Sequence, residues 1–178
     1  MENQLVTINL KKANVLSAIM LIASIVVSFT LKVLVFEKWS FGLGKWDLLL
    51  VIALCIIGFV VHEGVHAIAF LLSGAPKNSI KFGAIPKKMI LYCTTTKPLS
   101  PKCYKVALIS PLIVLGIIPL VISTVLLNYP YCFLFAIMVS GAAGDVLMFL
   151  ELLKCKDAKL IIDHPTEPAF YVIYDNEL

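Results

Sequence analysis

Hydrophobic residues are gathered into four continuous blocks along the chain, at about residues 14–36, 48–72, 106–127 and 131–152. Each block holds the roughly 20 apolar residues that a helix needs to cross a bilayer. Within the blocks, apolar and polar residues do not alternate with a period of two, which argues against a transmembrane β-barrel. The pattern therefore predicts an all-α membrane protein, with four transmembrane helices in a single integral membrane domain that covers residues 1–178.

The two longest polar stretches are the connection 75–105 and the tail 153–178, both predicted to be cytoplasmic from the lysine distribution described below. Four short runs in them predict strands, and hence short cytoplasmic β-hairpin elements. The runs are residues 79–83 and 88–92 of the connection and residues 159–162 and 169–174 of the tail. They form either one small sheet or separate hairpins with no shared pairing, and the sequence favours neither arrangement.

The composition supports the membrane interpretation. Hydrophobic residues make up 60% of the chain and charged residues only 15%, whereas soluble domains have about 45–50% and about 25%. An ordinary soluble enzyme and an intrinsically disordered chain are therefore excluded. All 15 basic residues are lysines. Without arginine or a dense basic stripe, the net charge of +4 gives no reason to expect nucleic acid as a partner.

The lysines are unevenly distributed among the segments that join the apolar blocks. Most lie in the connection 75–105, in the tail and near the N-terminus, and few lie in the other two connections. The positive-inside rule then places both termini and the connection 75–105 in the cytoplasm. We expect the stem of Lys32 to extend toward the opposite interface, where aromatic residues act as anchors. These anchors are Trp39, Trp46, Tyr129 and Tyr131.

One pentapeptide inside the second block concentrates the candidate chemistry. His62-Glu63-Gly64-Val65-His66 is an HExxH motif. Residues four apart share a face of a helix, so both imidazoles can point at one metal ion while Glu63 lies beside them to act on a water molecule. Ionisable groups inside a membrane are costly and are functional candidates by default. The alternative is a polar cluster that only holds helices together.

A catalytic zinc ion takes three protein ligands and keeps a fourth position open. Asp145 is the only other acid deep within an apolar block, and it follows a run of small residues. His66 and Asp145 are each about seven residues from the cytoplasmic ends of their blocks. At 1.5 Å per residue, both lie roughly 10 Å deep. The matching depths predict Asp145 as the third ligand, with a packing or proton-relay carboxylate as the alternative.

HExxH in one span, with an aspartate after small residues in a later span, resembles the site-2 protease class of intramembrane zinc metalloproteases. More closely, the chain is similar to the family of small four-span bacterial membrane proteins named "putative zincin peptidases", over about residues 48–174. Further features that carry this resemblance are Tyr92-Cys93, Lys97-Pro98-Leu99, Ser110-Pro111, Gly144-Asp145 and Asp163-His164-Pro165. The resemblance implies that His62, His66 and Asp145 bind Zn²⁺ and that Glu63 is the general base.

Two further residues, Ser140 and His164, are weighed as members of the site. Site-2 proteases place an asparagine and a proline before an aspartate-glycine pair, whereas here Ser140 precedes Asp145 and Val146 follows it. The group that binds the substrate carbonyl is therefore unassigned, and Ser140 is a weak candidate because serines within helices usually bond their own backbone. His164 stands before a proline and after an aspartate, which favours a turn, so it is left out of the ligand set.

The combined prediction is an intramembrane zinc metalloprotease in a bacterial cytoplasmic membrane. Its partners would be the lipid bilayer and a membrane protein or peptide substrate. Two other functions stay open, a zinc hydrolase of a non-peptide membrane substrate and a non-catalytic module that binds metal for structure or sensing. An open position on the metal would favour an enzyme, and a closed site of four ligands would favour the module. The sequence does not determine the oligomeric state.

Overall fold

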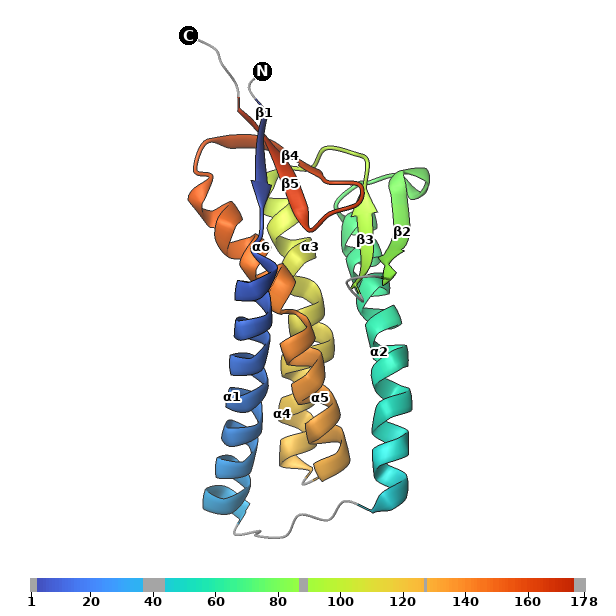
Figure 1. The fold of residues 1–178 in the computed structure, drawn as a ribbon, viewed down its shortest axis with the longest axis vertical. Coiled ribbons are helices and arrows are strands. Elements are labelled where there is room, and N and C mark those ends of the chain that lie inside the picture. Colours follow the sequence, from blue (N-terminus) through green and yellow to red (C-terminus); the bar gives the residue numbers. More distant parts are fainter. Residues whose placement is uncertain (1–2, 37–43, 87–89, 127, 175–178) are drawn as a thin grey trace.

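The computed structural model describes residues 3–36, 44–86, 90–126 and 128–174 of the chain. Long helices form a bundle, and short strands lie at the end of it where both termini are found (Figure 1). The predicted interface anchor Trp39 and residues 88–89 of the predicted strand 88–92 lie outside the described ranges. Within these described ranges, four helices or runs of helix are long and apolar enough to cross a membrane, which confirms the four apolar spans and fits a membrane protein.

Each span begins before the apolar block that predicts it. The first two are single helices, α1 (Leu10–Phe36) and α2 (Lys45–Leu72). The third consists of α3 (Pro101–Pro111), the π-helical segment η3 (Leu112–Ile117) and α4 (Ile118–Val125). The fourth consists of α5 (Tyr129–Gly141) and α6 (Ala143–Lys154).

Polar caps explain the earlier starts of the first and third spans. The Asn9 side chain accepts a hydrogen bond from the Lys11 backbone N–H at 2.9 Å, and Ser100 accepts one from the Cys103 N–H at 3.3 Å. Such residues satisfy backbone N–H groups that have no partner within the first turn of a helix. At the other end of α2, Gly74 has a φ of 84°, a conformation that glycine adopts without strain.

The third and fourth spans are interrupted, where the sequence predicts continuous helices. Pro111 lacks an N–H, and after it the chain widens into the π-helical turn. In the fourth span, Ala142 leaves the helical conformation with φ −80° and ψ 6°. It lies between two glycines that favour helix weakly, Gly141 and Gly144. The break makes Asp145 a residue of the first turn of a new helix.

The strands form two separate sheets in the described part of the chain. One is a hairpin of β2 (Ile80–Ile85) and β3 (Ile90–Thr95). The other has the order β1-β5-β4, all antiparallel, and contains β1 (Asn3–Thr7), β4 (Ala158–Asp163) and β5 (Ala169–Tyr174).

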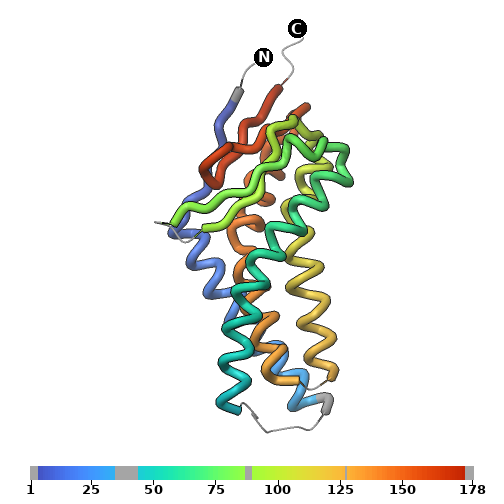
Figure 2. The backbone as a smooth tube through the Cα atoms, turned by 90° about the vertical axis from the view of Figure 1, so that its right-hand side faces the viewer, coloured from blue at the N-terminus to red at the C-terminus, as the bar shows by residue number. Residues whose placement is uncertain are grey.

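The predicted hairpins therefore do not share one sheet, and β1 was not predicted. An isolated β-bridge joins the connection to the tail, since Leu99 and Ile161 exchange backbone hydrogen bonds of 2.9 and 2.8 Å. Figure 2 shows the β2–β3 hairpin extending sideways from the top of α2 instead of along the bundle axis.

The buried core lies where the helices meet the sheets. It includes Phe70 of α2, Tyr104 of α3, Leu152 of α6 and Phe170 of β5, all at most 3% exposed. Farther along the bundle, α1 and α2 carry many exposed valine, leucine and isoleucine side chains. A large exposed apolar surface of this kind suits contact with lipid. The protein therefore has a well-packed core at the end that carries the strands and an exposed apolar surface along the rest of the helix bundle.

Lys32 contacts Tyr129, one of the aromatic residues that the sequence predicts as interface anchors. Its side chain is 2% exposed, and its Nζ lies 3.6 Å from the centroid of the Tyr129 ring. A cation over an aromatic face is attracted by the negative face of the ring, and this attraction strengthens when the pair is shielded from water. Lys32 is thus packed between α1 and the start of α5.

The structure makes the orientation testable with two exposed lysines at opposite ends of the bundle. Lys45 starts α2, and Lys156 follows α6. In a background with the five native cysteines replaced by alanine, we expect an impermeant thiol reagent to label Lys45→Cys in intact cells. Lys156→Cys should be labelled only after the cells are opened, because the lysine distribution places that end in the cytoplasm. Labelling of Lys156→Cys alone in intact cells would reverse the orientation.

Candidate metal centre

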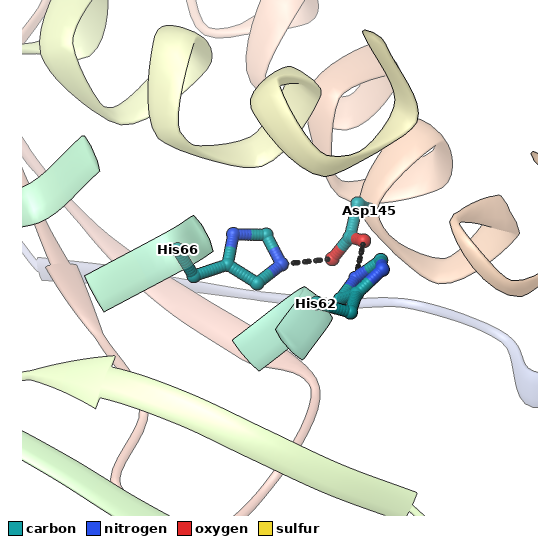
Figure 3. A group of neighbouring side chains, drawn as sticks. All are labelled: His62, His66 and Asp145. Carbon is teal, nitrogen blue, oxygen red and sulfur yellow. Dashed lines mark hydrogen bonds and ion pairs between the residues drawn. The ribbon is translucent and has the colours of Figure 1, made fainter. Parts of the chain in front are cut away.

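Two histidines of α2 and one aspartate of α6 lie side by side (Figure 3). His62 and His66 are both buried, with ring centroids 5.0 Å apart. His62 Nε2 lies 2.9 Å from Oδ2 of Asp145, and His66 Nε2 lies 3.4 Å from Oδ1 of the same carboxylate. The structure thus brings together His62, His66 and Asp145, of which the depth comparison places His66 and Asp145 at one level.

The backbone explains how Asp145 reaches α2. Asp145 is the third residue of α6, and the positive end of the helix dipole favours a carboxylate in the first turn. Just before the break, Gly141 allows a close approach between α5 and α2. A Cβ atom at Gly141 would lie 2.9 Å from Cε1 of Phe59 on α2. The small residues before Asp145 therefore set the spacing of the helices that carry the site.

A backbone carbonyl fixes the orientation of one imidazole. His66 Nδ1 lies 2.9 Å from the carbonyl oxygen of Ala107 in α3. A carbonyl oxygen only accepts, so Nδ1 carries the hydrogen and donates it. Nε2, on the opposite side of the ring, is left facing Asp145 and is the nitrogen that a neutral imidazole can offer to a metal.

The chemistry of the three side chains fits zinc. Their ligand atoms all lie within 4.8 Å of one another. Ligands about 2.1 Å from a tetrahedral ion are about 3.4 Å apart, so only small side-chain adjustments separate this arrangement from a shared ion. Two imidazoles and one carboxylate are a common ligand set of catalytic zinc. In the described part of the chain, no other group of three His, Cys, Asp or Glu residues meets this criterion.

A cavity of about 280 Å³ opens onto the three side chains. It is lined by α2, by the start of α6, by β3 and by the first turns of α1. Glu63 lines the same cavity but is not among the three clustered ligands. The backbone N–H of Cys93 in β3 is directed at the Glu63 carboxylate. Glu63 is thus placed to face a molecule in the cavity while the histidines face Asp145.

A second polar pair joins α3 to the strand β4, and sequence reasoning did not predict it. The Tyr104 hydroxyl donates to Oδ1 of Asp163 at 2.8 Å, which ties α3 to β4. Burial raises the pKa of the Asp163 carboxyl to about 6, although hydrogen bonds from Tyr104 and Thr94 act in the opposite direction. Burial also raises the pKa of the neighbouring Cys93 thiol to about 12, helped by the negative charges of Glu63 and Asp163. This thiol therefore stays protonated near neutral pH.

The structure also shows the hydrogen bonds of Ser140 and His164, the two residues that lie outside the ligand set predicted from the sequence. The Ser140 hydroxyl donates to the Ile137 carbonyl at 2.9 Å, so its hydrogen is used within its own helix. His164 lies in a turn, where its Nδ1 accepts backbone hydrogen bonds from Thr166 and Glu167 at 3.3 and 3.0 Å. His164 lines the cavity but lies outside the three-ligand cluster.

Two contacts of the site could not be found by searching for ligand-type residues. The Ala107 carbonyl is a backbone group without a side-chain signature, and the Tyr104–Asp163 pair joins residues 59 positions apart. One signal was present for the first contact. Pro111 stands four residues after Ala107, and a proline within a helix leaves the carbonyl four positions earlier without its usual donor.

Replacing Asp163 with asparagine should change how stability depends on pH. A carboxyl whose pKa rises from 3.8 to about 6 on folding stabilises the fold fully below pH 3.8, and this contribution is lost as the pH rises through 6. Between pH 4 and pH 7 we expect the wild type to lose up to about 3 kcal/mol of unfolding free energy relative to Asp163→Asn. Thermal unfolding in detergent at several pH values measures this difference.

Asp157→Asn is the matched control, because Asp157 is exposed in the turn before β4. This variant should follow the pH dependence of the wild type. If Asp163→Asn followed it too, the Asp163 carboxyl would not be perturbed by its surroundings.

Comparisons with known proteins agree with the geometry. The family model described as "Putative zincin peptidase" matches residues 55–160, more than half of the chain, and this range includes HExxH and Asp145. A protein from Pyrococcus woesei named "Uncharacterized 24.7 kDa protein in gap 5'region" is 32% identical over 115 residues. The match covers 62% of this chain and 50% of that protein, so the chain spans about half the length of the curated relative it matches.

No solved structure matches the chain. The description of the family indicates a zinc metallopeptidase. With the match over residues 55–160 and the clustered His62, His66 and Asp145, the chain belongs to the family described as "Putative zincin peptidase".

Proposed function

We propose that the protein is an intramembrane zinc metallopeptidase that hydrolyses peptide bonds of membrane-associated substrates. One observation carries this proposal: His62 Nε2 and His66 Nε2 each lie close to a different oxygen of the Asp145 carboxylate. Glu63 lines the cavity beside these three side chains. His62, His66 and Asp145 would hold the zinc ion. A bound zinc ion supplies an acidified water and a polarised scissile carbonyl.

Glu63 is the general base in this proposal. It follows His62 directly, and its carboxylate faces the cavity without joining the ligand cluster. A carboxylate in this place takes the proton of the attacking water and later delivers it to the leaving amine. The cavity gives water and substrate a route to the site from the end of the bundle that carries the strands.

The edge of β3 offers a way to hold a peptide in the cavity. β2 pairs with one edge of β3, and the Cys93 N–H points the other way, toward Glu63. Cavity-lining residues 92–94 belong to this strand. An extended peptide that adds to the open edge would gain backbone hydrogen bonds and would bring its carbonyls beside the general base. A transmembrane substrate would have to unwind locally to bind in this way.

The proposed setting is a cytoplasmic membrane with the cavity opening toward the cytoplasm. The lysine-rich connection and both termini are at the end of the bundle that carries the cavity. The positive-inside rule favours this end for the cytoplasm, and water from that side reaches the site without crossing the hydrocarbon core.

Zinc content tests the ligand set. We expect protein purified in detergent to contain about one zinc ion per chain, because two imidazoles and a carboxylate form a three-ligand site. His62→Ala, His66→Ala and Asp145→Ala should each lose most of this zinc, measured by elemental analysis after dialysis against a weak chelator. His164→Ala is the control, since His164 lines the cavity outside the cluster, and it should keep its zinc. Full occupancy in Asp145→Ala would remove Asp145 from the ligand set.

Glu63→Gln tests catalysis separately from metal binding. The change keeps the size of the side chain and removes the base, so we expect zinc content and thermal stability near those of the wild type. General acid–base assistance is typically worth about 10²–10⁴-fold, and cleavage should fall by that factor. The measurement is cleavage of fluorescently labelled single-span peptides, with Gly-Pro interruptions near the cytoplasmic end, reconstituted with the protein in liposomes.

Glu151→Gln provides the control for this experiment, because Glu151 pairs with Lys154 on the outside of α6. It should cleave at the wild-type rate. Loss of zinc in Glu63→Gln would make Glu63 a ligand or a structural partner. Equal cleavage by Glu63→Gln and wild type would contradict the mechanism, and a wild type that binds zinc but cleaves no peptide would favour a non-peptide substrate or a metal-binding module.

A further inference from the structure

The contact between His66 and Ala107 depends on an irregularity in α3. In a regular helix, the carbonyl of residue 107 accepts the N–H of residue 111. Residue 111 is proline, which has no N–H to donate. The next backbone N–H, that of Leu112, bonds to Ile109 instead. The Ala107 carbonyl therefore lacks its usual backbone donor at the level of the histidines.

Two side chains occupy this carbonyl in place of the backbone donor. His66 Nδ1 and Ser110 Oγ each lie 2.9 Å from the Ala107 oxygen. A carbonyl oxygen has two lone pairs, so these two donors use its full capacity. A serine commonly shares a helical carbonyl with the regular backbone donor. Because residue 111 has no N–H, the His66 imidazole takes the place of the backbone donor at the Ala107 carbonyl.

We propose that Pro111 is a positioning residue of the metal site, acting through the Ala107 carbonyl on His66. Without a donor at residue 111, Ala107 accepts the Nδ1–H of His66, and the ring is held with Nε2 toward Asp145. This inference rests on the proposed function, because the oriented Nε2 matters as a zinc ligand. Partners that orient a ligating histidine typically affect metal affinity by 10- to 100-fold when they are lost.

Restoring the missing donor tests the proposal. In Pro111→Ala the new N–H competes with His66 for the Ala107 carbonyl. We expect the zinc dissociation constant, measured by chelator competition in detergent, to rise 10- to 100-fold. Pro119→Ala is the matched control, since it also removes a proline from the third span. Pro119 and the residues four and five positions before it, Leu115 and Val114, are not among the described residues that line the cavity. Its zinc affinity should stay at the wild-type value.

A second variant separates the N–H from the proline ring. Lactic acid at position 111, introduced by nonsense suppression, has the side chain of alanine, no ring and an ester oxygen in place of the N–H. If the missing donor is what matters, the lactic acid variant binds zinc like the wild type while Pro111→Ala binds it weakly. Equal weakening in both variants would assign the effect to the ring, and unchanged affinity in Pro111→Ala would also overturn the proposal.

A readout in metal-free protein keeps this test separate from the proposed function. In histidine labelled with ¹⁵N, the Nδ1–H of His66 should be protected from solvent exchange in the wild type and in the lactic acid variant. It should lose this protection in Pro111→Ala. A wild type that binds no zinc would contradict the proposed function, and the protection pattern would still decide whether Pro111 positions His66.

Discussion

The placement of polar groups in an apolar bundle is the constraint on which the rest of this structure depends. Polar and charged groups without partners are costly in such surroundings. Asp145 places one carboxylate oxygen against each of two imidazoles, and Ala107 accepts from the far side of one of them. Three helical segments from separate spans, α2, α3 and α6, must therefore meet at one level. The break in the fourth span places Asp145 in the first turn of α6, and Pro111 in the third span leaves the Ala107 carbonyl able to accept from His66.

From the site, a column of aromatic rings leads to the strands at the end of the bundle. His66 stacks on Phe70, Phe70 on Tyr104, and Tyr104 contacts Phe170 of β5, with centroid distances of 6.4, 6.4 and 5.7 Å. The Tyr104 hydroxyl continues to Asp163 of β4. Close-packed rings of this kind transmit strain and resist deformation. The three-stranded sheet is thus connected through these rings to His66 of the candidate metal site, although it lies outside the apolar spans.

The sequence predicts the elements that follow from strong local patterns. Apolar blocks locate the spans, HExxH locates two of the clustered side chains, and the matching depths of His66 and Asp145 locate the third. It does not predict β1, because a strand of five residues that pairs with β5 has no local signal of its partner. Nor does it predict the break at Ala142 or the packing of Lys32 over Tyr129, since both depend on neighbouring spans. The ligand roles and the substrate remain proposals.

Because the chain is synthesised from its N-terminus, His62 is made well before Asp145, the residue it contacts in the fold. The two residues are 83 positions apart. At 5–20 residues per second, the ribosome needs roughly 4 to 17 s to add the chain between them. During that interval the two histidines of α2 exist without the carboxylate that they contact in the fold, and polar groups in apolar surroundings are costly until they find a partner. Asp145 is the last of the three residues to be synthesised, so the contact that ties α6 to α2 can form only when most of the chain has been made.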